Sequence, residues 1–108
     1  MFEEWPDSFT PPLRREVNPP QPVFVDLAKA IPINRRGPFG RDKTPMRVKA
    51  GGLVLTGQTP GRLHAWARTS DGVWLGLVEF VLLTGNELGR LPVTQWCQQE
   101  ALTPTGRQ

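Results

Sequence analysis

The feature that most constrains this fold is a pair of apolar segments separated by Asp71-Gly72. Residues 62–70 and 73–82 are rich in aliphatic, aromatic and β-branched side chains, and both have the length of a strand. Asp-Gly between two such segments is the strongest short-range signal for a β-hairpin, because both residues tolerate the positive φ angles of a tight turn. The sequence therefore predicts a hairpin over residues 62–82.

The register of this hairpin follows from where each possible turn places the charged side chains. With Asp71 and Gly72 as the two central turn residues, His64 pairs with Glu79, and the charged strand residues all share one face. A three-residue loop would instead place Glu79 among apolar side chains at a high desolvation cost, so we expect the two-residue turn. The face expected to be buried then holds Leu63, Ala65, Ala67, Thr69, Trp74, Gly76, Val78, Phe80 and Leu82.

Proline separates the first part of the chain from the rest. Nine of the 12 prolines lie in residues 1–45, and proline both removes a backbone donor and disfavours helix in the preceding residue. We therefore expect residues 1–45 to form an extended, partly basic arm with polyproline-like stretches. Within this arm, the apolar residues 23–33 are expected to pack as a strand or a helical turn against the later strands.

Residues 46–104 have the pattern of a small β domain, followed by a short tail. Alternation in residues 46–50 predicts a strand with one solvated face, and residues 53–56 and 91–96 predict two more. One 3₁₀ turn is expected within residues 97–101. Four to five short strands without a long helix predict a mainly β protein, and this order of elements resembles an SH3-like barrel.

Residues with catalytic or metal-binding chemistry are scarce. The only histidine, His64, and the only cysteine, Cys97, could form a nucleophile–base pair, but isolated residues of these types usually pack in a core or lie on the surface. They cannot supply a typical metal-ligand set, and no glycine-rich phosphate loop leads into a helix. The sequence therefore predicts a non-enzymatic protein without catalytic residues, metal site or cofactor.

Three further features of the sequence predict where in the cell the protein is found. No apolar segment is long enough to cross a bilayer, and the acidic N-terminus lacks the apolar region of a secretory signal. A single cysteine excludes an internal disulfide framework. These features predict a cytoplasmic protein without a membrane partner.

Charge distinguishes the middle of the chain from its ends. Residues 29–68 hold nine basic residues and one acidic residue, for a net charge of +8, whereas the rest of the chain has a net charge of −5. Basic residues interspersed with aromatic ones can neutralise phosphates and stack on bases, so we expect this segment to bind nucleic acid or an acidic protein surface. The residues expected to make these contacts are Arg35, Arg36, Phe39, Arg41, Lys43, Arg47, Lys49, Arg62, Trp66 and Arg68.

Trp66 is the aromatic residue whose expected neighbours most strongly indicate a binding site. On the expected polar face of the hairpin it lies among Arg62, His64 and Arg68, and tryptophan and arginine dominate binding hot spots. The alternative is that a proline of the N-terminal arm covers Trp66.

The first 20 residues combine aromatic with acidic side chains. Phe2, Trp5 and Phe9 are interleaved with acidic residues, a pattern typical of short segments that become ordered on binding a partner. The leading prediction is a non-enzymatic binding module, a basic small β-barrel that contacts nucleic acid. The alternative is a protein–protein adaptor, assembly or inhibitor protein, for example from a mobile element or phage, whose N-terminal arm docks on a partner chain.

Overall fold

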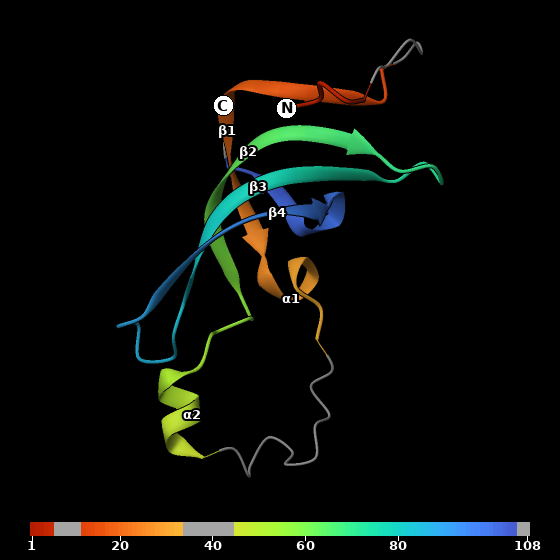
Figure 1. Ribbon diagram of the computed structural model, residues 1–108. Coiled ribbons are helices and arrows are strands. Elements are labelled where there is room, and N and C mark those ends of the chain that lie inside the picture. Colours follow the sequence, from red (N-terminus) through yellow and green to blue (C-terminus); the bar gives the residue numbers. More distant parts are fainter. Residues whose placement is uncertain (6–11, 34–44, 106–108) are drawn as a thin grey trace.

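The computed structural model describes residues 1–5, 12–33 and 45–105 (Figure 1). These residues form a mainly β structure, as predicted, in which five antiparallel strands make one curled sheet shaped like half of a barrel. The strands are β1 (Arg14–Asp26), β2 (Gln58–Arg68), β3 (Trp74–Leu83), β4 (Arg90–Gln98) and β5 (Leu102–Pro104), in the sheet order β4-β3-β2-β1-β5. The helices are α1 (Leu27–Ala30), α2 (Met46–Gly51) and the 3₁₀ helix η1 (Gln99–Ala101).

Strand β1 comes from the segment that the sequence suggested is an arm. It pairs with β2 on one side and with β5 on the other, so it lies inside the sheet. Val23 and Val25 on this strand are buried. The prediction that residues 23–33 pack as a strand or a helical turn is confirmed by β1 and α1. The sheet therefore begins at Arg14 and not at residue 46.

Pro19 and Pro20 of β1 lie where the pairing of this strand with β2 is interrupted. The pairing of β1 with β2 changes register between Glu16 and Gln21, and the Asn18–Pro19 peptide bond in that interval is cis. Proline cannot donate to a sheet ladder, so it is tolerated where the ladder is interrupted. Figure 1 shows β1 turning sharply, from a segment along the top of the sheet to one that descends toward α1.

Residues 46–51 form helix α2, so the predicted strand over residues 46–50 is wrong. Met46 and Val48 are both exposed, which shows that the alternating pattern does not correspond to a buried face. The C-terminal end of α2 is hydrogen-bonded to the turn after β3, where Asn86 N donates to Ala50 O at 2.8 Å. The strand expected over residues 53–56 is reduced to one isolated bridge, Leu53 with Thr84. None of the helices in the described ranges is long and apolar enough to cross a membrane.

The β2–β3 hairpin has a three-residue loop, so the predicted two-residue turn is wrong. Thr69 N donates to Val73 O at 2.8 Å, which closes a loop of residues 70–72. The Thr69 hydroxyl donates to the Asp71 carboxylate and accepts from Val73 N at 3.0 Å. Gly72 has a φ of 92°, a left-handed conformation that glycine adopts without a steric penalty.

A bulge at His64 keeps Glu79 out of the core despite this longer loop. Ala65 pairs with Leu77, but Leu63 pairs with Val78, so β2 contains one extra residue between these two pairs. A shift of one residue reverses the faces of a strand. The part of β2 between the bulge and the loop therefore faces the opposite way from the prediction, whereas Leu63 stays in the core.

The core lies on the concave face of the curl, which we call the inner face; the opposite side is the outer face. Asp26 ends β1 and caps α1, accepting hydrogen bonds from Ala28 N at 3.1 Å and Lys29 N at 3.3 Å. The predicted strand over residues 91–96 and the 3₁₀ turn are confirmed by β4 and η1. The buried cluster consists of Val23, Val25, Leu27, Leu63, Val78, Phe80, Leu82, Cys97 and Ala101.

Candidate functional site

A pocket opens on the inner face near the β2–β3 loop. It has a volume of about 360 Å³ and is lined by Arg15, Trp66, Trp74 and Gln99, which come from β1, β2, β3 and η1. Arg15 is the cross-strand partner of Trp66, and directly opposed residues in an antiparallel pair point to the same side of the sheet. The register of β1 against β2 therefore determines that an arginine lies beside this indole. We call this cavity the tryptophan pocket.

Gly76 allows Trp66 to lie against the core. The two residues are cross-strand partners, and a Cβ atom added at Gly76 would come within 3.3 Å of the indole of Trp66 and 2.7 Å of Leu102 Cδ1. Trp66 is half-buried because one side of its indole packs on the core cluster while another lines the pocket. The prediction that Trp66 lies on an exposed polar face is wrong, since the bulge turns it to the inner face.

Arg68 adds a second positive charge beside the pocket. Its guanidinium carbon lies 5.5 Å from the ring centroid of Trp74, within the range of a cation–π interaction. Arg68 Nε also donates to Gly72 O at 3.2 Å, which holds the side chain against the loop. Among the described residues, neither Arg15 nor Arg68 has a carboxylate within ion-pair distance. Both guanidinium groups are therefore available to an anionic ligand.

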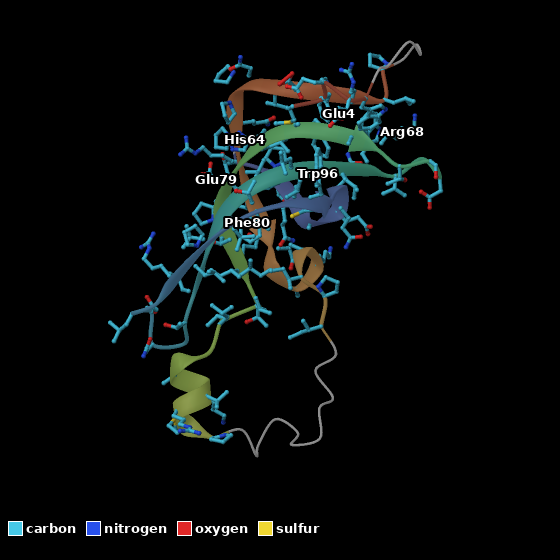
Figure 2. The ribbon with its side chains drawn as sticks, in the orientation of Figure 1. Glu4, His64, Arg68, Glu79, Phe80 and Trp96 are labelled. Atoms are coloured by element: carbon cyan, nitrogen blue, oxygen red, sulfur yellow. The ribbon has the colours of Figure 1, made fainter. Side chains whose placement is uncertain are left out.

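Arg62 lies on the outer face, away from the tryptophan pocket. Its Nε atom is 3.9 Å from Glu79 Oε1. His64 Nε2 is 3.1 Å from the same oxygen, and Figure 2 labels both His64 and Glu79. The predicted proximity of His64 and Glu79 is thus observed as a side-chain contact, although the bulge makes Arg62 the backbone partner of Glu79. The structure separates Arg62 from Trp66 and Arg68, with which the sequence grouped it.

The other basic residues expected to bind a ligand are not brought to the pocket. Arg47 and Lys49 are exposed on α2, which lies at the opposite end of the molecule from the β2–β3 loop (Figure 1). The remaining expected contacts fall outside the described residues: Arg35, Arg36, Phe39, Arg41 and Lys43.

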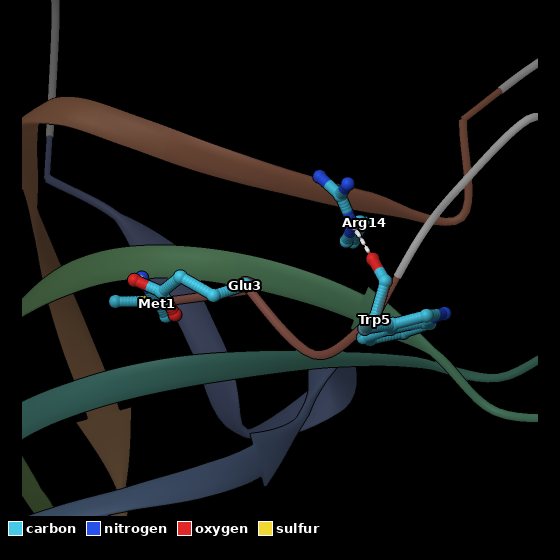
Figure 3. Close-up of polar contacts among 4 residues, drawn as sticks. All are labelled: Met1, Glu3, Trp5 and Arg14. Carbon is cyan, nitrogen blue, oxygen red and sulfur yellow. Dashed lines mark hydrogen bonds and ion pairs between the residues drawn. The ribbon is translucent and has the colours of Figure 1, made fainter.

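Phe2 and Trp5 pack on the outer face of this protein's own sheet. The ring centroid of Phe2 lies 5.5 Å from that of Trp5 and 6.4 Å from that of Trp96 on β4. Arg14 Nε donates to Trp5 O at 2.6 Å (Figure 3). The Arg14 guanidinium carbon lies 5.3 Å from the Phe2 ring centroid. The described part of the N-terminal segment therefore covers Trp96, not Trp66. Phe9, the third aromatic residue of the expected docking arm, lies outside the described residues.

His64 and Cys97 lie on opposite faces of the sheet and do not form a catalytic pair. Cys97 is buried on the inner face, and this burial raises the pKa of its thiol. A protonated, buried thiol is a poor nucleophile. In the part of the chain that the structure describes, no group of three or more His, Cys, Asp or Glu residues is arranged to hold a metal ion.

The sequence does not predict three of the residues that line the tryptophan pocket as site residues: Arg15, Trp74 and Gln99. The proline pattern predicts that Arg15 belongs to an extended arm, and the two-residue turn predicts that Trp74 lies on the buried face of the hairpin. A three-residue loop would have revealed part of the site, because it pairs Arg68 with Trp74 directly beside the loop. No signal in the sequence places Arg15 next to them, since that contact depends on the pairing of β1 with β2.

The tryptophan pocket offers groups for stacking, charge pairing and hydrogen bonding. Two indole rings offer flat stacking surfaces, two guanidinium groups offer positive charge, and the Gln99 amide can both donate and accept hydrogen bonds. Comparisons of the chain with protein-family models, curated proteins and solved structures gave no match. The geometry of this pocket is therefore the basis for a functional proposal.

Proposed function

We propose that this protein is a non-enzymatic binding module that holds single-stranded nucleic acid at the tryptophan pocket. The observation that carries the proposal is the presence of Trp66, Trp74, Arg15 and Arg68 around one open cavity. Stacking of a base on an aromatic side chain contributes about 1–3 kcal/mol, and every base can stack. Arginine both contacts phosphate and stacks on planar groups.

The size and charge of the pocket support this proposal. Its volume of about 360 Å³ is at the lower end of the range of small-ligand sites, roughly 300–1,000 Å³, and suits one planar ring system at a time. The basic residues 29–68, with their net charge of +8, would add attraction for a phosphate backbone beyond the pocket.

We also infer that the curled sheet is an SH3-like barrel. The strand order β4-β3-β2-β1-β5 supports this inference, as does the position of η1 between β4 and β5. Barrels of this kind bind ligands on grooves lined by aromatic side chains, and many of those ligands are proline-rich peptides. The two arginines beside the indoles favour a polyanion over such a peptide here.

A titration of labelled single-stranded DNA and RNA across a salt series tests the proposal. Trp74→Ala should lower affinity by about 1–3 kcal/mol at every salt concentration, because a stacking surface is lost. Arg68→Ala should flatten the slope of log affinity against log salt by about 0.7, since one phosphate contact disappears from a single strand. Arg62→Ala is the matched control, because it removes the same charge from the outer face.

Two outcomes would refute this function. The first is no binding at low salt by the parent chain. The second is an equal loss for Arg62→Ala and Arg68→Ala, which would show that only net charge matters. Co-purification of the intact chain with a protein partner would then favour the adaptor alternative.

A further inference from the structure

The outer face carries a groove that the N-terminal segment fills only in part. Residues 1–5 lie against β2, β3 and β4, and a space of about 410 Å³ remains between the segment and these strands. This space is open to solvent, so residues 1–5 cover the groove floor without filling the groove. The groove is lined by Met1, Phe2, Glu4, Trp5, Ala67, Leu75 and Trp96. We call it the outer groove.

The floor of the outer groove is apolar because of the bulge at His64. Beyond this bulge, the outward-facing residues of β2 are Ala65 and Ala67, and their partners on β3 are Leu77 and Leu75. Trp96 pairs with Leu77 and stays 40% exposed even with the N-terminal segment in place. An apolar surface with an exposed tryptophan is typical of a protein-interaction site.

The contacts of the N-terminal segment show which features this groove recognises. Trp5 N donates to Phe2 O at 3.0 Å, so the two aromatic rings are presented from one tight turn, three residues apart. Arg14 donates to the backbone carbonyl of Trp5 (Figure 3) and also lies over the Phe2 ring. Glu3 and Glu4, which lie between Phe2 and Trp5 in the sequence, are exposed. The N-terminal ammonium donates to Glu3 Oε1 at 2.6 Å. The positive charge of Arg14 beside Phe2 and Trp5 adds a long-range attraction for an acidic segment.

We propose that the outer groove binds an acidic segment of another protein that presents two aromatic side chains three residues apart, and that residues 1–5 occupy the groove until that partner displaces them. We choose a different protein over a second copy of this chain because residues 1–5 of a second copy would leave the same open space of about 410 Å³, whereas a bulkier segment would use it. The tethered segment competes at a high effective concentration, so it would weaken the partner's binding without abolishing it. This surface lies on the opposite side of the sheet from the tryptophan pocket and does not depend on it.

An NMR titration of the full, ¹⁵N-labelled chain tests this proposal with two synthetic peptides. One has the sequence of residues 1–5, and the other carries the Phe2→Trp change, which provides a larger ring to fill the remaining space. The indole N–H signals of Trp96 and Trp74 report on the two faces separately. In the double variant F2A/W5A, which vacates the groove, both peptides should shift Trp96 and not Trp74. The Phe2→Trp peptide should bind more tightly, and the parent chain should bind each peptide about tenfold more weakly.

Trp96→Ala in the F2A/W5A chain should abolish peptide binding, whereas Trp74→Ala should leave it unchanged. If F2A/W5A does not fold, the same titration of the parent decides the question, because a saturable shift confined to Trp96 supports the groove. Absence of any Trp96 shift, or an equal response to a peptide with both aromatic residues replaced by alanine, would refute the proposal. A parent dimer that becomes monomeric in F2A/W5A would also overturn it, since the groove would then belong to a second copy.

Discussion

The bulge at His64 divides the sheet into two ends, and the inner and outer faces differ in burial and polarity between these ends. At the α1 end, the inner face is fully buried, as at Leu63 and Val78, and the outer face carries the exposed charges of Arg62 and Glu79. At the loop end, the inner face opens into the tryptophan pocket, and the outer face is apolar and lies under the N-terminal segment. One extra residue in β2 produces this difference, because it reverses the faces of the strand from that point on.

This difference predicts that the α1 end of the sheet mainly stabilises the fold and that the loop end binds the proposed ligand. Val25 and Val78 at the α1 end are 0% exposed, and burying a side chain of this kind contributes roughly 1.5–3 kcal/mol. At the loop end, Trp66 and Trp74 are only half-buried, so part of their aromatic surface remains available to a ligand. We therefore expect substitutions at the α1 end to unfold the protein and substitutions at the loop end to affect binding first.

The largest effect is expected from a charge placed on the inner face of the α1 end. Val78→Asp should cost more than about 4 kcal/mol of unfolding free energy, because the carboxylate would be buried without a partner. Leu77→Asp, one residue away on the outer face, should cost only about 1–2 kcal/mol. Urea denaturation of both variants measures the contrast. Equal losses would contradict the positions of Val78 on the inner face and Leu77 on the outer face of β3.

A smaller loss is expected where the core meets the tryptophan pocket. Gly76→Ala places a Cβ atom 2.7 Å from Leu102 Cδ1 and 2.8 Å from Leu63 Cδ1, so the core must shift. Overpacking of this kind costs about 1–3 kcal/mol. Gly51→Ala is the control, because an added Cβ atom there has no neighbour within 4 Å. Thermal melting of both variants tests this prediction, and an unchanged melting temperature for Gly76→Ala would contradict the close packing around it.

The two tryptophans of the pocket should differ in their effect on stability. Trp66 packs on the core cluster whereas Trp74 is not part of it, so Trp66→Ala should cost about 2 kcal/mol and Trp74→Ala less than about 1 kcal/mol. Chemical denaturation of the two variants, followed by circular dichroism, measures this difference. A larger loss of stability for Trp74→Ala would contradict the packing of Trp66, and not Trp74, on the core cluster.

The smallest effect concerns the thiol of Cys97. Burial raises its pKa, so the folded state favours the protonated thiol, and this contribution to stability is present below the thiol's unfolded pKa, about 8.5. It is lost as the pH rises through the higher folded pKa. Stability should therefore fall above about pH 9, and Cys97→Ala should lack this part of the fall. Urea titrations at pH 7 and pH 10 measure the effect. An identical pH dependence in Cys97→Ala would contradict it.

Local patterns were sufficient for part of this fold. The class of the protein, the strand β4, the 3₁₀ helix η1 and the inner face of β3 follow from alternation and turn residues within short stretches of sequence. Val78, Phe80 and Leu82 were expected in the core and are buried there, because β3 has no bulge and its alternation is unbroken. The same local logic identified Trp66 and Arg68 as residues of interest, but it placed Trp66 on the wrong face.

Tertiary structure decided the features that depend on pairing between distant segments. The sequence does not reveal that β1 enters the sheet between β2 and β5, because its prolines indicate an extended arm. Alternation alone also cannot reveal the bulge at His64, which arises where β2 must fit two partners at once. These pairings bring Arg15 to Trp66 and Phe2 to Trp96, so both candidate sites exist only in the folded chain. The physical reason is that a strand's own sequence determines its alternation, whereas its neighbours determine its register and therefore the face that each residue occupies.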